Sequence, residues 1–353
     1  MHSSLSANSL SSDYEVTEGR VGWQSPSNIA LVKYWGKRAN QIPENPSISL
    51  TLTNSYTNTY CSFKNNNDGL KVKFFFEGKE NIQFGARIEK WLASLIPTFP
   101  FLGNMDLVFE SENSFPHSAG IASSASAMSA IALCICEIER IMGTHVVDFY
   151  QRASHIARLG SGSACRSIYS TAALWGAIEA GHDEYAVPMK DKIDPVFHTF
   201  QDAILIVDQK PKSVSSSLGH QLMENNPFAR PRYQRANENM TEIFSAMAGG
   251  DLEKMGTIIE EEALSLHAMM MLSNYLLLKP GSLAIIEKVR KIRNSEKWPL
   301  YFTIDAGPNI HLLYPQGITR QVKDFIEIEL KQHCSEERII YDMVGNGPVN
   351  LIT

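Results

Sequence analysis

The 353-residue sequence lacks the features that mark a membrane protein or a nucleic-acid-binding protein. No uninterrupted apolar segment is long enough to cross a bilayer, because His267, Ser273 and Asn274 interrupt the run that comes nearest. The chain holds 32 Lys and Arg against 38 Asp and Glu, a net charge of −6, which argues against a broad basic surface. We therefore expect no nucleic-acid or membrane partner, and any anion-binding site must be local.

Cysteine is scarce and shows no pairing pattern. The chain has five cysteines, an odd number, and only Cys134 and Cys136 are closely spaced. Those two lie in a helical pattern, where residues two apart face different directions. The first twenty residues are polar and rich in serine, without the apolar core of a secretion signal. We predict reduced thiols, a flexible leader over residues 1–20 and a cytoplasmic protein.

The apolar pattern divides the rest of the chain into two halves. Residues 21–193 open with alternating, strand-like segments and continue with helical spacing, most clearly over residues 123–142. Residues 194–353 follow a β-α-α-β-α-β order, which is typical of helices on one face of an antiparallel sheet. The sequence thus predicts an α+β fold with two domains, 21–193 and 194–353.

A stretch of small side chains is the most unusual feature that is present. Residues 115–126 read FPHSAGIASSAS and lead into an apolar helical run. Small side chains let a ligand approach the backbone, and the unpaired amides at a helix start favour an anion such as phosphate. Taken alone, the stretch fits equally well a helix that packs tightly through small residues.

Three further clusters carry chemically useful side chains. Residues 25–38 read SPSNIALVKYWGKR, residues 158–170 read RLGSGSACRSIYS, and residues 301–314 read YFTIDAGPNIHLLY. Cations beside aromatic groups suit a phosphate ester, and Arg166 offers a planar fork for a carboxylate or phosphate. Asp305 ends an apolar strand, where it can orient or deprotonate a hydroxyl. The structural alternatives are a solvated strand end, a Gly-Ser turn and a turn-capping aspartate.

Together these segments closely resemble the mevalonate diphosphate decarboxylases of the GHMP kinase superfamily. NIALVKYWGKR, FPHSAGIASSAS, GSGSACRS and TIDAGPN occur in the family's order, and the resemblance runs from about residue 21 to the C-terminus. It implies a ribosomal protein S5 domain 2-like N-terminal half carrying the ATP phosphate loop. It also implies a ferredoxin-like C-terminal half carrying the catalytic aspartate, with the active site in the cleft between the halves.

The resemblance implies a reaction and a set of site residues. The reaction is ATP-dependent conversion of mevalonate 5-diphosphate to isopentenyl diphosphate by 3-hydroxyl phosphorylation and elimination, with Mg²⁺, in a homodimer of the mevalonate pathway. The implied catalytic residues are Asp305, Arg166, Lys33 and Asn28. The implied substrate-binding residues are Tyr34, Trp35, Gly36, Lys37, Ser161, Gly162, Ser163, Ala164, Cys165, Arg166 and Ser217. The implied ATP-binding residues are Pro116, Ser118, Ala119, Gly120, Ala122, Ser123, Ser124 and Ser126, with Ser124 as a Mg²⁺ contact.

Two segments depart from the family at the diphosphate end of the substrate. Where the family reads SSTxGM followed by a Val-Glu-Thr run, this chain reads SSSLGHQLMENNP over residues 215–227. A further family arginine has no clear counterpart, although Arg87 is available. The departures leave open a decarboxylase of mevalonate 5-phosphate. A mevalonate 3-kinase is a further alternative, which the presence of both Asp305 and Arg166 argues against. A non-catalytic nucleotide-binding regulator on the same scaffold is the alternative from another class.

Overall fold

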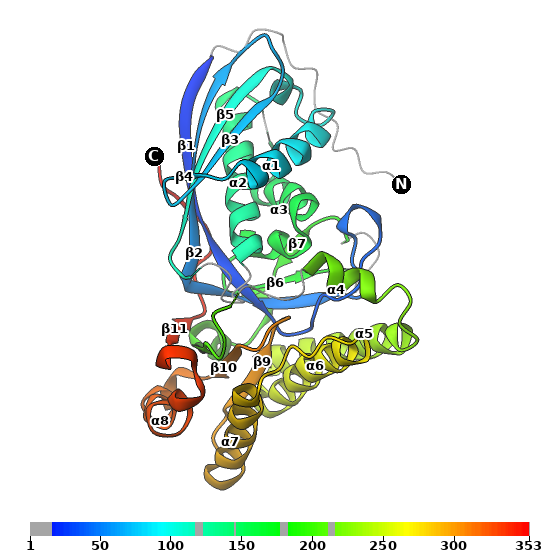
Figure 1. Cartoon of the computed structure of the whole chain (residues 1–353), viewed down its shortest axis with the longest axis vertical. Helices are drawn as coiled ribbons and strands as arrows, with labels where there is room; N and C mark the ends of the chain where they lie inside the picture. The colour runs from blue at the N-terminus through cyan, green and yellow to red at the C-terminus, as the bar shows by residue number, and fades with distance from the viewer. Residues whose placement is uncertain (1–15, 117–122, 145, 177–182, 211–215, 353) are drawn as a thin grey trace.

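The computed structural model describes residues 16–116, 123–144, 146–176, 183–210 and 216–352. Two sheets organise these residues (Figure 1). The larger sheet contains β1 (Glu18–Ala30), β2 (Ser47–Asn65), β3 (Lys71–Phe76), β4 (Lys79–Glu80), β5 (Met105–Asn113), β6 (Ala172–Trp175), β7 (Ala186–Pro188) and β12 (Val349–Asn350). The smaller sheet contains β8 (Gln201–Leu205), β9 (Tyr301–Ile304), β10 (Ile310–Tyr314) and β11 (Ile339–Met343). The predicted α+β class is confirmed.

The helices divide between the two halves of the chain. They are α1 (Ile82–Leu95), α2 (Ser123–Ile141), α3 (Phe149–Gly160), α4 (Ser216–Leu222), α5 (Ala229–Gly249), α6 (Leu252–Leu272), α7 (Pro280–Glu296) and α8 (Thr319–Phe325). Figure 1 shows α1, α2 and α3 together on one side of the larger sheet. None of the helices in the described ranges is both long and apolar enough to span a bilayer.

The larger sheet has the order β12-β1-β2-β5-β3-β4, with β6 and β7 joined along β2. Consecutive strands β2 and β3 are not neighbours, because β5 lies between them and pairs in parallel with β3. The helix α1 connects β3–β4 to β5, and a helical crossover of this kind is what parallel pairing requires. The strand β1 begins at Glu18, so residues 18–20 of the predicted leader belong to the sheet, whereas residues 1–15 lie outside the described residues.

The smaller sheet, of order β11-β8-β10-β9, is antiparallel and is covered on both faces. Leu205, Phe302 and Leu312 face α7 and α8 in one buried cluster. Ile204 and Leu313 on the other face join a cluster with residues of β1, β2, α5 and α6. The sequence favoured helices on one face only. The second face is apolar as well, because α5 and α6 pack against it together with β1 and β2 of the N-terminal half, so helices contribute to both faces.

The C-terminus returns to the first half of the molecule. The strand β12 pairs antiparallel with β1, and Asp342 on β11 accepts hydrogen bonds from the backbone of Thr53 and Asn54 on β2. The predicted domain 194–353 therefore contributes a strand to the larger sheet. All five cysteines are free and buried, in agreement with the prediction that none is paired.

The close packing of α6 on β9 generates a stability prediction. A Cβ added at Gly256 on α6 would lie 2.0 Å from Cδ1 of the buried Tyr301 ring on β9. We expect Gly256→Ala to lower the free energy of unfolding by about 1–3 kcal/mol, because the ring and helix must separate. Gly249→Ala is the control, since nothing lies within 4 Å of its Cβ position. Urea unfolding of the two variants tests the packing, and equal midpoints would contradict it.

Candidate active site

The centre of the candidate site is an ion pair between the two halves of the chain. Lys33 follows β1, and Asp305 follows β9; Lys33 Nζ lies 2.8 Å from Asp305 Oδ1. The Lys33 side chain is 2% exposed and that of Asp305 is 26% exposed. Lys33 Nζ also donates to the carbonyl oxygen of Ala30 at 2.7 Å. The carboxylate therefore faces the solvent-accessible side of the pair, where a ligand can reach it.

Arg166 lies close to this pair and is itself buried. Its Nε donates to Ser49 Oγ at 3.1 Å, and one Nη donates to Asn28 Oδ1 at 3.4 Å. The other, Nη1, is buried and finds no partner among the residues that the structure describes. Burial lowers the pKa of Arg166, while the nearby negative charge of Asp305 raises it. An Arg side chain keeps its charge in proteins, so Nη1 is a strong donor that suits an anionic ligand.

Asn28 holds the short helix that carries Arg166. Its Nδ2 donates to Ser167 Oγ at 2.8 Å and to the carbonyl oxygen of Ser163 at 3.3 Å. Asn28 follows an irregularity in the pairing of β1 with β2, which directs its amide toward the helix η3 (Gly162–Ile168). The resemblance placed Asn28 and Arg166 in one site, and the structure brings the two together. Ser49 had no signal in the sequence, where it reads as an ordinary strand residue, whereas Ser167 lies in the GSGSACRS motif but was not assigned a role.

The Gly-Ser segment presents its residues alternately. Ser161 and Ser163 are partly exposed, whereas Gly162, Ala164 and Cys165 are buried. A Cβ at Gly162 would lie 2.8 Å from the Tyr34 ring, so glycine permits the approach of that ring. The Cys165 thiol donates to the Gly162 carbonyl oxygen at 3.0 Å, and burial raises its pKa to about 12. The two serine hydroxyls can therefore contact a ligand, whereas Ala164 and Cys165 pack beneath the segment that carries them.

An aromatic cluster forms the next part of the site. The Tyr34 ring lies 4.6 Å from the Trp175 ring and 4.3 Å from the His220 ring, measured between centroids. The Tyr34 hydroxyl and the Trp35 indole Nε1 are buried without a partner in the described part of the chain. Trp35 packs against the methionines Met269 and Met270 of α6. Tyr34 thus presents a donor toward the site, whereas most of Trp35 belongs to the core.

His220 on α4 was missed by sequence reasoning as a site residue. Its Nδ1 accepts the Gly36 backbone N–H at 2.9 Å, and Gly36 has a φ of +100°, which glycine tolerates. Burial, with Lys37 as a smaller cause, lowers the pKa of His220 to about 3. The only signal for His220 in the sequence is its position in residues 215–227, the segment that departs from the family. Ser217 lies exposed in the first turn of α4.

A cavity of about 530 Å³ lies beside His220 and Lys37. Its lining includes Lys37, Glu44, His220, Arg230 and Tyr233. Burial lowers the pKa of Lys37, and the positive charge of Arg87 on α1 lowers it further, so the two cations lie near each other. Converging cations favour a ligand with more than one negative charge. Arg87, which the sequence left unassigned, is near enough to Lys37 to lower its pKa but does not line this cavity.

The phosphate loop is described only at its edges. Ser118, Ala119, Gly120 and Ala122 lie outside the described residues. Pro116 and Ser123 are partly exposed and Ser124 is exposed at the start of α2. Ser126 differs, because it is fully buried and its hydroxyl lies 2.7 Å from that of Thr57 on β2. Its side chain packs the helix against the sheet instead of facing a ligand.

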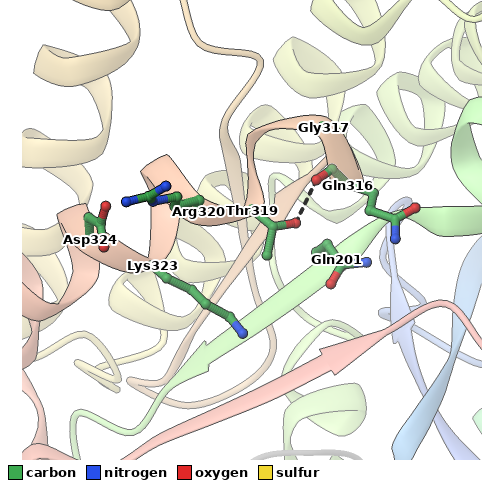
Figure 2. A pocket seen from close by; sticks show the side chains of 7 residues that line it. All are labelled: Gln201, Gln316, Gly317, Thr319, Arg320, Lys323 and Asp324. Atoms are coloured by element: carbon green, nitrogen blue, oxygen red, sulfur yellow. Dashed lines mark hydrogen bonds between the residues drawn. The ribbon is translucent and has the colours of Figure 1, made fainter.

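A second hollow, of about 570 Å³, lies elsewhere (Figure 2). It is lined by Gln201, Gln316, Gly317, Thr319, Arg320, Lys323 and Asp324. In the register of the smaller sheet, Gln201 pairs with Tyr314, whereas Ile304, the residue before Asp305, pairs with Ile310 at the other end. The hollow is therefore at the opposite end of the sheet from Asp305 and does not belong to the site.

Comparison with known proteins places this geometry in a family. The family model for the diphosphomevalonate decarboxylase-like N-terminal domain matches residues 25–186, and that for the mevalonate 5-diphosphate decarboxylase C-terminal domain matches residues 203–350. The diphosphomevalonate decarboxylase of Candida albicans is 30% identical over 92% of this chain and 96% of its own. That of Saccharomyces cerevisiae is 30% identical over 82% and 76%.

Solved structures agree with the sequence relatives. The mevalonate diphosphate decarboxylase of Staphylococcus aureus superposes with a TM-score of 0.83 at 28% identity, covering 95% of this chain and 98% of that one. A complex of MDDEF with MVAPP, AMPPCP and magnesium gives a TM-score of 0.81 at 28% identity, covering 95% and 99%. The two domain models and the full-length relatives together show that this chain belongs to the diphosphomevalonate decarboxylase family.

Proposed function

We propose that this protein catalyses the ATP-dependent decarboxylation of mevalonate 5-diphosphate to isopentenyl diphosphate, with ADP, phosphate and CO2 as co-products. The observation that carries the proposal is the arrangement of Asp305 beside Lys33, with the unpartnered Nη1 of Arg166 nearby. Relatives bearing this activity in their names, and a related complex containing MVAPP, AMPPCP and magnesium, support it. Because the proposed substrate is mevalonate 5-diphosphate and the product isopentenyl diphosphate, the reaction belongs to the mevalonate pathway of isoprenoid biosynthesis.

The reaction has two steps, phosphoryl transfer to the 3-hydroxyl and then elimination with loss of CO2, and each step uses different side chains. Asp305 orients the 3-hydroxyl and accepts its proton as the γ-phosphoryl group of ATP is transferred to that oxygen. The C3–O bond of the phosphorylated intermediate then breaks, and phosphate leaves. The electron pair of the C1–C2 bond becomes the C2–C3 double bond as CO2 departs. Arg166 holds the C1 carboxylate in one orientation until then, and Lys33 balances the charge of Asp305.

The start of α2 suits the phosphates of ATP. The structure describes a helix of 19 residues from Ser123, and the first amides of a helix have no partner within it, so they can bind an anion such as phosphate. Among the described residues, no group of three or more His, Cys, Asp and Glu side chains is placed to hold a metal. Mg²⁺ would thus take most of its ligands from ATP phosphates and water, with the exposed Ser124 hydroxyl as a protein ligand.

The diphosphate end of the substrate would lie near Lys37. The proximity of Arg87 to Lys37 and the adjoining cavity support this position. Tyr34, Ser161 and Ser163 would contact the body of the substrate, since the two serines are partly exposed and the Tyr34 ring lies against Gly162 between them. We further propose a homodimer, which rests on the family resemblance, and a cytoplasmic location, which the five free thiols support.

A product assay tests the proposed function. The protein is incubated with ATP, Mg²⁺ and either mevalonate 5-diphosphate or mevalonate 5-phosphate, and ADP and CO2 are measured separately. We expect equal amounts of both products from the diphosphate, because one phosphoryl transfer precedes each decarboxylation. ADP without CO2 would indicate a 3-kinase. Products from mevalonate 5-phosphate alone would indicate a decarboxylase of the monophosphate. Neither product with ATP bound would indicate a regulator.

Asp305→Asn tests the role of the carboxylate. The variant keeps the side-chain shape but removes the proton acceptor, so we expect turnover to fall by about 10²- to 10⁴-fold while both substrates still bind. Turnover numbers and the apparent affinities for ATP and mevalonate 5-diphosphate provide the measurement. A loss smaller than about tenfold would make Asp305 a turn residue.

Arg166→Lys tests the carboxylate fork. A lysine keeps the charge, but one ammonium cannot reach Ser49, Asn28 and the substrate as the guanidinium does. We expect decarboxylation to fall by about 10²-fold, because the carboxylate loses its fixed orientation, with little change in ATP affinity. Melting temperature, ATP affinity and rate are measured on one preparation. A destabilised variant with normal activity would instead assign Arg166 to holding the Gly-Ser turn.

A further inference from the structure

The helix α6 contacts both partners of the Lys33–Asp305 pair through buried polar side chains. Glu262 Oε2 accepts the backbone N–H of Lys33 at 2.9 Å. His267 Nε2 lies 3.1 Å from the backbone carbonyl oxygen of Asp305. Glu262 and His267 are each 1% exposed, and neither carries a motif signal in the sequence. We propose that Glu262 and His267 are positioning residues that set the separation of Lys33 and Asp305.

Two side chains of α5 fix the orientation of the Glu262 carboxylate. The same Oε2 atom accepts from Arg232 on α5 at 2.6 Å, and Oε1 accepts from Asn239 on α5 at 2.8 Å. A buried carboxylate with a charged partner and full hydrogen bonding holds one orientation. The Lys33 N–H is therefore bound to an acceptor that cannot move without breaking the α5–α6 contact. This anchor acts on the backbone of Lys33, and its ammonium stays directed at Asp305.

His267 acts on Asp305 as a neutral donor. A carbonyl oxygen only accepts hydrogen bonds, so Nε2 carries the proton in this contact. Burial, with the positive charge of Lys33 as a smaller cause, lowers the pKa of His267 to about 4, although the hydrogen bond to Asp305 opposes this shift. Nδ1 finds no partner in the described ranges and needs no proton. The neutral imidazole holds the Asp305 backbone without adding a positive charge beside Lys33.

A third contact fixes α6 to the start of the strand that carries Asp305. Glu260 Oε1 accepts the backbone N–H of Phe302 on β9 at 3.4 Å, and Glu260 also pairs with Arg293 on α7. Glu260 and His267 therefore hold β9 at two points, three residues apart along the strand. Glu262 lies between them on the same helix and holds Lys33. The helix α6 thus determines the position of Lys33 relative to Asp305.

The test uses His267, because removing the Glu262 carboxylate would leave the buried Arg232 charge without a partner and unfold the region. His267→Leu removes the donor at similar volume, whereas His267→Gln can place an amide N–H near the position of Nε2. Ser265→Ala is the matched control on α6, since among the described residues the Ser265 hydroxyl bonds within the helix, to the carbonyl oxygen of Glu262 at 3.1 Å.

We expect His267→Leu to lower kcat by about 10- to 100-fold, because misplacing a reacting group by ~1 Å has an effect of this order. The KM values for ATP and mevalonate 5-diphosphate should change less than about threefold, His267→Gln should recover most of kcat, and Ser265→Ala should match the wild type. Equal loss in His267→Leu and His267→Gln, tracking their melting temperatures, would overturn the inference, as would a fully active His267→Leu.

The inference rests on the proposed catalytic role of Asp305, and the wild-type assay separates the two. A wild-type protein that releases neither ADP nor CO2 from mevalonate 5-diphosphate refutes the proposed function, whatever the variants do. An active wild type with an active, folded His267→Leu refutes only the positioning role. Comparing kcat, KM and melting temperature for the four proteins under one set of conditions therefore assigns each outcome to one of the two proposals.

Discussion

The buried ammonium of Lys33 is the constraint on which the arrangement of the two halves depends. An ammonium that is 2% exposed loses nearly all of its hydration, and this cost must be offset by a close opposite charge and hydrogen bonds. Asp305 supplies the charge and Ala30 supplies a carbonyl oxygen. Because Lys33 and Asp305 come from different halves, the charge is compensated only when those halves are correctly packed. The interaction that favours the assembled fold therefore also assembles the site.

The junction between the halves is fixed by further buried polar groups. Asp202 on β8 pairs with His311 on β10 at 2.7 Å, and both are 2% exposed. Asp342, opposite Asp202 in the register, accepts from the backbone of β2. Unlike apolar packing, these contacts have one correct geometry, since a displaced partner leaves a buried polar group unsatisfied. Asp342 ties the smaller sheet to β2, while the Asp202–His311 pair joins β8 to β10 within that sheet. Asp305, which follows β9, is thereby held opposite Lys33.

Local pattern predicted the elements well and their long-range pairing poorly. Helical spacing over residues 123–142 predicted α2, which ends one residue earlier, because periodicity is a local property. The insertion of β5 between β2 and β3 was not visible, since pairing depends on tertiary packing. Likewise, Lys33, Arg166 and Asp305 were brought together by resemblance and not by spacing. Glu262 and His267 read as ordinary helix residues, because their role exists only through backbone atoms of other segments.

The unpartnered donors around Tyr34 explain how such a site can discriminate among anions. The Tyr34 hydroxyl, the Trp35 Nε1 and the Arg166 Nη1 are buried without partners among the described residues. Each such group costs about 1–3 kcal/mol until it is satisfied. A ligand that supplies acceptors at these positions recovers that free energy, whereas one lacking the carboxylate leaves the buried Arg166 donor unpaired. Sites built from buried donors reject such analogues far more strongly than apolar pockets do. Because Ser49 and Asn28 hold Arg166, and the Tyr34 ring packs against Trp175 and His220, these donors have fixed positions and selectivity follows from the rigidity of the fold.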